Sequence, residues 1–83
     1  MNRSDIYAAI DTERNRQDKK RAASHPWGQG SASSVNVPTI VKVAVLTEEV
    51  GEVARAVLDR DGDNLRTELV QVSAVAVAWL ESM

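Results

Sequence analysis

The chain has 83 residues, a formal net charge of −2 and 43% apolar residues, with no cysteine and a single histidine. That length allows one small domain, residues 1–83. The lack of cysteine excludes disulfides and thiolate zinc sites, and one histidine cannot form a paired-histidine metal site. The slightly acidic balance gives no general attraction to nucleic acid, and no apolar run is long enough to cross a bilayer. We therefore expect neither as a partner.

The first helix is expected over about residues 4–21. Ser4 is a good N-cap residue and is followed by Asp5 in the first turn. Ile6, Tyr7 and Ile10 form one short apolar stripe, and the rest of the helix is almost wholly polar. The first residues carry charge and no apolar run, so we expect no signal peptide and a cytoplasmic location.

Residues 22–37 are rich in Gly, Ser and Pro and are expected to form a loop. Loops of this length in small domains are usually functional or disordered. Trp27 is the best candidate for stacking on a nucleobase, and it is equally a candidate for anchoring the loop on the core. His25 is a weaker candidate for a base or sugar contact, with an ordinary loop residue as the alternative.

The second helix is expected over about residues 38–60, with Pro38 in its first turn. Gly62 is expected to end the following turn, and Asp63 or Asn64 to cap a third helix over about 63–82. The short turn predicts an antiparallel helical hairpin. Apolar residues of the second helix recur three and four apart, which predicts a single buried stripe; they are Val43, Leu46, Val50, Val53, Ala54 and Val57.

The third helix is apolar nearly all round, so we expect it to be buried on several sides. One expected face carries Leu65, Leu69, Val72, Ala76 and Trp79, and the opposite face carries Val70 and Val77. Two further helices in one short chain can hardly cover it. The chain also has no Phe and few aromatic residues, which gives a thin core. We therefore predict an all-α fold that assembles into an oligomeric helical bundle, either a dimer or a tetramer.

Carboxylates gather on the two helices of the predicted hairpin. Glu49 and Glu52 lie three residues apart and project side by side, while Glu48 points further towards solvent. Glu68 and Gln71 have the same spacing among apolar residues, and an antiparallel hairpin brings both pairs to one level. Converging carboxylates repel one another unless a cation joins them, and oxygen-only ligands suit Mg²⁺ or Mn²⁺. The alternative is a solvated acidic helix face, which is common.

The run Glu48-Glu49-Val50-Gly51-Glu52, followed by Glu68-Leu69-Val70-Gln71, resembles the EExxE…ExxD signature of the MazG-like all-α nucleoside triphosphate pyrophosphohydrolases. The resemblance covers residues 38–82 well and the first helix loosely. It implies hydrolysis of the α–β phosphoanhydride of a ribo- or deoxyribonucleoside triphosphate, giving a monophosphate and pyrophosphate.

The resemblance also implies roles for single residues. Glu49, Glu52 and Glu68 would ligate Mg²⁺, and Glu48 would orient the attacking water or act from outside the ligand shell. Glu48 and Glu49 are thus the catalytic candidates. Gln71 stands where the signature has Asp, so it offers a carbonyl oxygen without charge. A degenerate, non-catalytic interaction module derived from this family is the alternative.

Basic residues supply candidates for phosphate binding. Lys42 precedes Glu49 by seven residues and lies on the same helix face, or it is a solvated lysine near the helix start. Arg14 belongs to a basic run that either clamps phosphates or forms a solvated helix end; the other members are Arg16, Lys19, Lys20 and Arg21.

Overall fold

A computed structural model describes residues 1–20, 24–25, 28–29 and 32–83, and this part of the chain contains three helices. They are α1 (Arg3–Lys20), α2 (Thr39–Leu58) and α3 (Gly62–Glu81). The expected all-α class is confirmed. The segment expected as loop also carries a two-residue antiparallel ladder, in which β1 (Ser24–His25) pairs with β2 (Gly28–Gln29).

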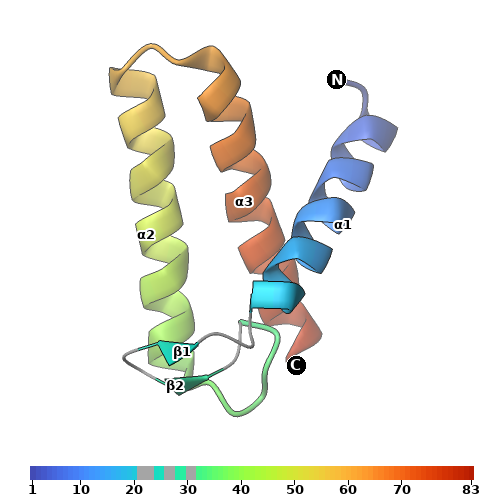
Figure 1. The fold of residues 1–83 in the computed structure, drawn as a ribbon, viewed down its shortest axis with the longest axis vertical. Helices are drawn as coiled ribbons and strands as arrows, with labels where there is room; N and C mark the ends of the chain where they lie inside the picture. The colour runs from blue at the N-terminus through green and yellow to red at the C-terminus, as the bar shows by residue number, and fades with distance from the viewer. Residues whose placement is uncertain (21–23, 26–27, 30–31) are drawn as a thin grey trace.

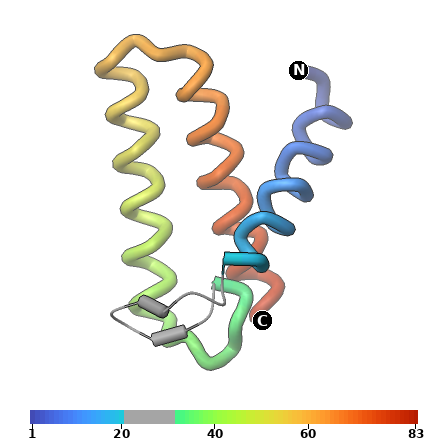
Figure 2. The backbone as a smooth tube through the Cα atoms, in the orientation of Figure 1, coloured from blue at the N-terminus to red at the C-terminus, as the bar shows by residue number. Residues whose placement is uncertain are grey.

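The three helices form a hairpin with one flanking helix. Helices α2 and α3 run antiparallel, and α3 lies between α2 and α1 and packs against both (Figure 1). Helix α1 runs in the same general direction as α3; its N-terminal end splays away and its C-terminal end approaches the end of α3 (Figure 1). Residues 32–38 pass under the end of the hairpin at which α2 begins and α3 finishes (Figure 2). Val37, 6% exposed, anchors this segment.

Helix α1 begins two residues after Met1, with Asn2 as its N-cap in place of the expected Ser4. The Asp5 backbone N–H donates to Asn2 Oδ1 at 2.9 Å, and the Asn2 backbone N–H donates to Asp5 Oδ2 at 3.4 Å. This reciprocal pair has the form of a capping box, in which two otherwise unpaired donors are satisfied. Asn and Ser are both good caps, so residue type alone does not select between them.

A buried arginine joins α1 to the end of α3. Arg14 is 4% exposed, and its Nε and Nη2 donate to Glu81 Oε1 and Oε2 at 3.1 and 2.7 Å. The same Nη2 donates to Asp18 Oδ1 at 3.0 Å, and Nη1 donates to Gln17 Oε1 at 3.3 Å. This two-pronged geometry fixes both distance and orientation. The contact therefore sets where α1 meets α3.

The buried apolar core consists of small side chains: Val37, Ala56, Ala74, Val75 and Ala78. The expected single stripe on α2 is corrected, because Leu46 and Val53 are half-buried while Val43, Val50, Ala54 and Val57 are exposed. On α3 the buried face is formed by Ala74, Val75 and Ala78, and Leu69 from the expected face is 49% exposed. Val and Ala occur all round both helices, so their spacing does not mark the contact face.

The turn between α2 and α3 differs from the expected glycine stop. Arg60, with φ of 54°, takes the left-handed position after the helix. Its N–H donates to the Val57 carbonyl at 3.1 Å, and the Asp61 N–H donates to the Ala56 carbonyl at 3.1 Å. This is a Schellman arrangement. Gly62 is the first residue of α3, and Asp61, in place of the expected Asp63 or Asn64, caps that helix by accepting from the Asn64 N–H at 3.1 Å.

Among the described residues, no helix has the length and apolar character needed to cross a membrane.

Replacing Arg60 with glycine is expected to raise the free energy of unfolding by up to about 1 kcal/mol, because glycine adopts the left-handed conformation without the Cβ penalty. Urea unfolding followed by circular dichroism measures the change. Arg66→Gly is the control, since it places glycine inside α3 and is expected to destabilise by about 1 kcal/mol. Equal destabilisation by both substitutions would contradict the assignment of the turn.

Candidate functional site

Two glutamates interact electrostatically where α2 and α3 lie side by side. Glu49 comes from the middle of α2 and Glu68 from the first half of α3, and both are half-buried. One carboxylate oxygen of each, Oε2, is buried and has no hydrogen-bond partner among the described residues. Burying an unpaired carboxylate oxygen is costly. The pair is therefore a locally destabilising feature of the protein as it stands.

The pKa of Glu49 is raised above its ordinary value. Desolvation is the largest cause, and the negative charge of Glu68 is the next. Glu48, Glu52 and Glu13 add smaller contributions of the same sign. Proximity of an opposite charge would reverse this shift, because it would favour the ionised form. The electrostatics at Glu49 thus favour either a proton or a cation.

The other predicted ligands lie at the margin of this pair. Glu48 and Glu52 are exposed, and Gln71 is half-buried three residues after Glu68. Glu49 turns towards α3 while Glu52 faces solvent, so the two do not share one environment as the spacing suggested. The antiparallel hairpin accounts for the approach of Glu49 to Glu68, as expected from the short turn.

Helix α1 adds Glu13, which the sequence did not single out, and Arg16, which the sequence indicated only as a member of the basic run. The Glu13 side chain is 11% exposed and accepts from Arg16 Nε at 2.7 Å. This hydrogen bond is the main cause of the raised pKa of Arg16, to which the charge of Glu49 also contributes. Arg16 is half-exposed and carries positive charge to the edge of the carboxylates. The local sequence does not indicate that Glu13 and Arg16 lie near Glu49, because their position depends on how α1 packs against α3.

Two predicted phosphate-binding residues are engaged elsewhere. Lys42 is 4% exposed and donates from Nζ to Ser82 Oγ at 2.6 Å, so it is not the solvated lysine considered above. Arg14 is directed at Glu81 and Asp18. Lys19 and Lys20 are exposed at the end of α1. Trp27 and Arg21 lie outside the described residues, and of His25 only the backbone is described.

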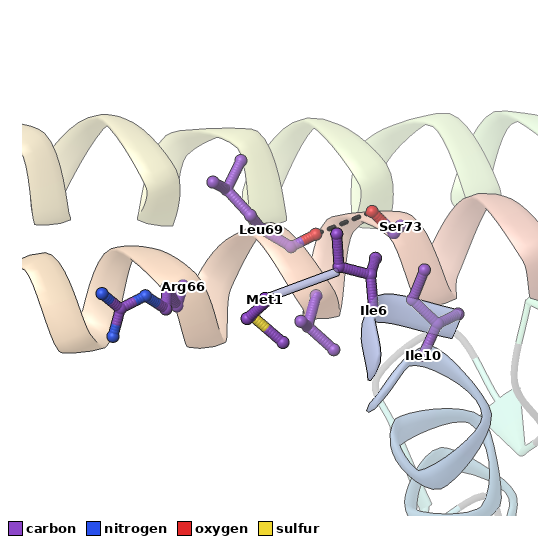
Figure 3. A pocket seen from close by; sticks show the side chains of 7 residues that line it. Met1, Ile6, Ile10, Arg66, Leu69 and Ser73 are labelled. Carbon is purple, nitrogen blue, oxygen red and sulfur yellow. Dashed lines mark hydrogen bonds between the residues drawn. The ribbon is translucent and has the colours of Figure 1, made fainter. Parts of the chain in front are cut away.

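Hollows flank the contact between α1 and α3. One, of about 450 Å³, is bounded by Ala9, Thr12, Glu13, Thr67 and Val70 and so borders the carboxylates at Glu13. A second, of about 160 Å³, is almost entirely apolar. In Figure 3 its lining side chains Ile6 and Ile10 lie beside Leu69 and Ser73 of α3. The Ser73 hydroxyl donates to the Leu69 carbonyl at 2.8 Å, so it presents little polar character there.

The carboxylate pair suits a hard divalent cation whose remaining ligands are water and phosphate, and it does not suit a metal ion held by protein ligands alone. Within the described ranges, no three His, Cys, Asp or Glu side chains are grouped closely enough to surround a metal ion. Mg²⁺ commonly uses one or two carboxylates and completes its shell with water and substrate phosphates. Glu49 and Glu68, each with an unpartnered buried oxygen, meet that requirement.

No protein-family model, curated protein or solved structure matches the chain.

Substituting Glu49 with glutamine is expected to stabilise the metal-free protein at pH 7. A carboxyl group with a raised folded-state pKa costs stability once the pH rises above its unfolded value, about 4.3, and the cost is complete above the folded-state pKa. The gain should therefore shrink as the pH falls towards 4. Thermal unfolding in EDTA at both pH values tests this, with the exposed Asp11→Asn as the charge-matched control. A Glu49→Gln protein that is less stable at pH 7 would contradict the assignment.

Proposed function

We propose that the protein is a Mg²⁺-dependent nucleoside triphosphate pyrophosphohydrolase of the MazG-like kind. The observation that carries the proposal is the electrostatic interaction between Glu49 and Glu68, each of which has a buried carboxylate oxygen with no partner in the described part of the chain. The acidic signature of residues 48–52 and 68–71 supports the same reading. Mn²⁺ is a possible substitute, because it accepts the same oxygen ligands.

Glu49 and Glu68 would hold the cation between α2 and α3, with Glu52 and the Gln71 carbonyl oxygen at the margin. When bound, Mg²⁺ supplies neutralisation of phosphate charge and a lowered pKa for coordinated water. The exposed Glu48 carboxylate would orient the attacking water and accept its proton. The water oxygen forms a bond to phosphorus as the bond to the bridging oxygen breaks, and pyrophosphate leaves.

The substrate would lie along the open side of α1. Arg16 also binds a carboxylate, that of Glu13, but its guanidinium is partly exposed next to Glu49, so among the described residues it is the candidate for a phosphate contact. It replaces Arg14 in this role, since Arg14 is bound to Glu81. The hollow bounded by Ala9, Thr12 and Thr67 offers a place for the nucleoside. Trp27 remains the candidate for stacking on the base, and Lys42 would have to release Ser82 to reach a phosphate.

A homo-oligomer is part of the proposal. The described core has no large, fully buried side chain, while large apolar residues are exposed on all three helices. A chain of this size gains little stability from so thin a core. Assembly of several copies of the chain would bury the apolar side chains that are exposed in one copy.

Pyrophosphate release from a panel of ribo- and deoxyribonucleoside triphosphates tests the activity. We expect release with Mg²⁺ and none in EDTA, and a loss of at least about 100-fold in Glu49→Gln and Glu68→Gln, because each substitution removes a metal-ligating carboxylate and even losing an outer partner of a ligand costs about 10–100-fold. Asp11→Asn is expected to retain full activity. Absence of release from every triphosphate by folded protein would refute the proposal.

The alternative, a non-catalytic helical interaction module, is favoured by one residue, because Gln71 supplies no charge where the signature has Asp. Gln71→Asp separates the two. In the enzyme, this substitution should lower the melting temperature in EDTA through repulsion from Glu68 and raise it in Mg²⁺ above that of the wild type. A wild-type protein that is indifferent to Mg²⁺, beside a Gln71→Asp protein that responds, would identify a module that has lost its metal site.

A further inference from the structure

A continuous chain of hydrogen-bonded side chains runs along α1. Arg14 Nη1 donates to Gln17 Oε1 at 3.3 Å, and Gln17 Nε2 donates to Glu13 Oε2 at 3.4 Å. Glu13 in turn accepts from Arg16 Nε at 2.7 Å and from Arg16 Nη2 at 2.5 Å. We call these four side chains the α1 network. It connects the contact between Arg14 and Glu81, which sets the position of α1, to the arginine that lies beside the carboxylates.

The direction of each hydrogen bond in the α1 network is fixed by its chemistry. Arginine only donates, and an ionised glutamate only accepts. Gln17 lies between one of each, so its carbonyl oxygen faces Arg14 and its amide nitrogen faces Glu13. A glutamate at position 17 would have the same shape but could not donate to Glu13. The network therefore requires an amide at this position.

The burial of Glu13 costs stability. Its side chain is 11% exposed, whereas the other acidic residues of α1 are exposed; they are Asp5, Asp11 and Asp18. Desolvation is the largest cause of the raised pKa of Glu49, and the negative charge of Glu13 adds to it. A carboxylate at an exposed position of α1 would pair with arginine without either cost. The location of Glu13 is therefore better explained by its effect on Arg16 than by stability.

The hydrogen bonds to Glu13 leave much of the Arg16 guanidinium available. They use two of the five N–H donors of an arginine, and the other three have no partner in the described part of the chain. The Arg16 side chain is 45% exposed. Arg14, by contrast, is 4% exposed and could reach a ligand only by leaving its present partners. Arg16 is thus oriented on one side and open on the other.

We propose that Glu13 is a positioning residue, which holds the Arg16 guanidinium beside Glu49 so that its remaining N–H donors bind the phosphate chain of the substrate. Because the guanidinium is already oriented, less conformational entropy is lost when phosphate binds. The proposal deepens the proposed function and rests on it for the identity of the substrate. Binding of a polyphosphate nevertheless tests it separately from hydrolysis.

Net charge and positioning predict opposite effects of removing the Glu13 carboxylate. If net charge alone mattered, Glu13→Gln would strengthen polyphosphate binding, because it removes a negative charge from the neighbourhood of an anion. If Glu13 positions Arg16, the same substitution weakens binding, because a neutral amide offers one acceptor oxygen to the guanidinium in place of two charged ones. The sign of the change in affinity therefore separates the two explanations.

Isothermal titration calorimetry with inorganic tripolyphosphate in Mg²⁺ measures that sign. Glu13→Gln and Arg16→Lys are each expected to weaken binding at least about 10-fold, the scale of losing a partner that orients a binding group. The double variant should bind no more weakly than Arg16→Lys, because Glu13 acts only through Arg16. Asp11→Asn, which removes the same charge from an exposed position of α1, should bind like the wild type. Unweakened binding by Glu13→Gln, or no binding by the wild type, would overturn the proposal.

Gln17→Glu provides a second test, which also covers a Glu13→Gln protein that does not fold. The new carboxylate would repel Glu13 and draw it away from Arg16, so we expect binding of tripolyphosphate to weaken at least about 10-fold. Asn15→Asp is the matched control, because it adds the same charge to the same helix at an exposed position. Equal weakening by both substitutions would show an effect of charge alone and would contradict the positioning role.

Hydrolysis distinguishes failure of this proposal from failure of the proposed function. In Glu13→Gln, the kcat of pyrophosphate release should fall at least about 10-fold, while the rise in melting temperature on adding Mg²⁺ persists because Glu49 and Glu68 are intact. Release by the wild type with an unchanged kcat in Glu13→Gln would refute the role of Glu13 and leave the enzyme standing. Binding of tripolyphosphate that depends on Glu13, without release from any triphosphate, would support the role of Glu13 and refute the enzyme.

Discussion

Small side chains make the buried contacts of α2 and α3, and this governs how the rest of the chain is stabilised. Ala56, Ala74 and Ala78 are almost completely buried. Alanine lets helix backbones approach closely, yet each one removes little apolar area from water. Polar contacts hold the ends of the arrangement instead, Lys42 with Ser82 and Arg14 with Glu81. Both contacts lie at the C-terminal end of α3, at Glu81 and its C-cap residue Ser82, so they hold α1 and α2 to the same end of that helix.

The same close approach makes the carboxylates costly. Glu49 and Glu68 project from helices whose buried apolar residues are small, and water reaches only part of each side chain. Repulsion and desolvation then act together on Glu49. A chain with so little apolar burial has a small free energy of unfolding, so a destabilising feature of this kind lowers it by a large fraction. A local violation of this kind is more typical of a working site than of a structural contact.

Much of the fold could be predicted from the sequence, and the limits have physical causes. Helical spacing and the short turn predicted the hairpin, and the hairpin predicted the approach of Glu49 to Glu68. The capping residues were misassigned, because Asn2 and Asp61 are as suitable as the expected Ser4, Asp63 and Asn64, and because Arg60 occupies a position that usually favours glycine. The partner of Arg14 lies 67 residues away, so no local pattern could indicate it. Glu13 was missed as a site residue for the same reason, and the sequence indicates Arg16 only as one member of a basic run for phosphate binding.

Helix α2 turns two of its charged residues inward and several of its large apolar residues outward. Lys42 and Glu49 face α3, while Ile40, Val50 and Val57 face solvent. A surface helix of a stable monomer shows the reverse order. The inner face is satisfied if Ser82 holds the lysine and a cation joins the glutamates; the outer face is satisfied if a second chain covers it. The orientation of this one helix therefore links the proposed metal site to the proposed self-association, since a rotation that buried the outer residues would carry Glu49 away from Glu68.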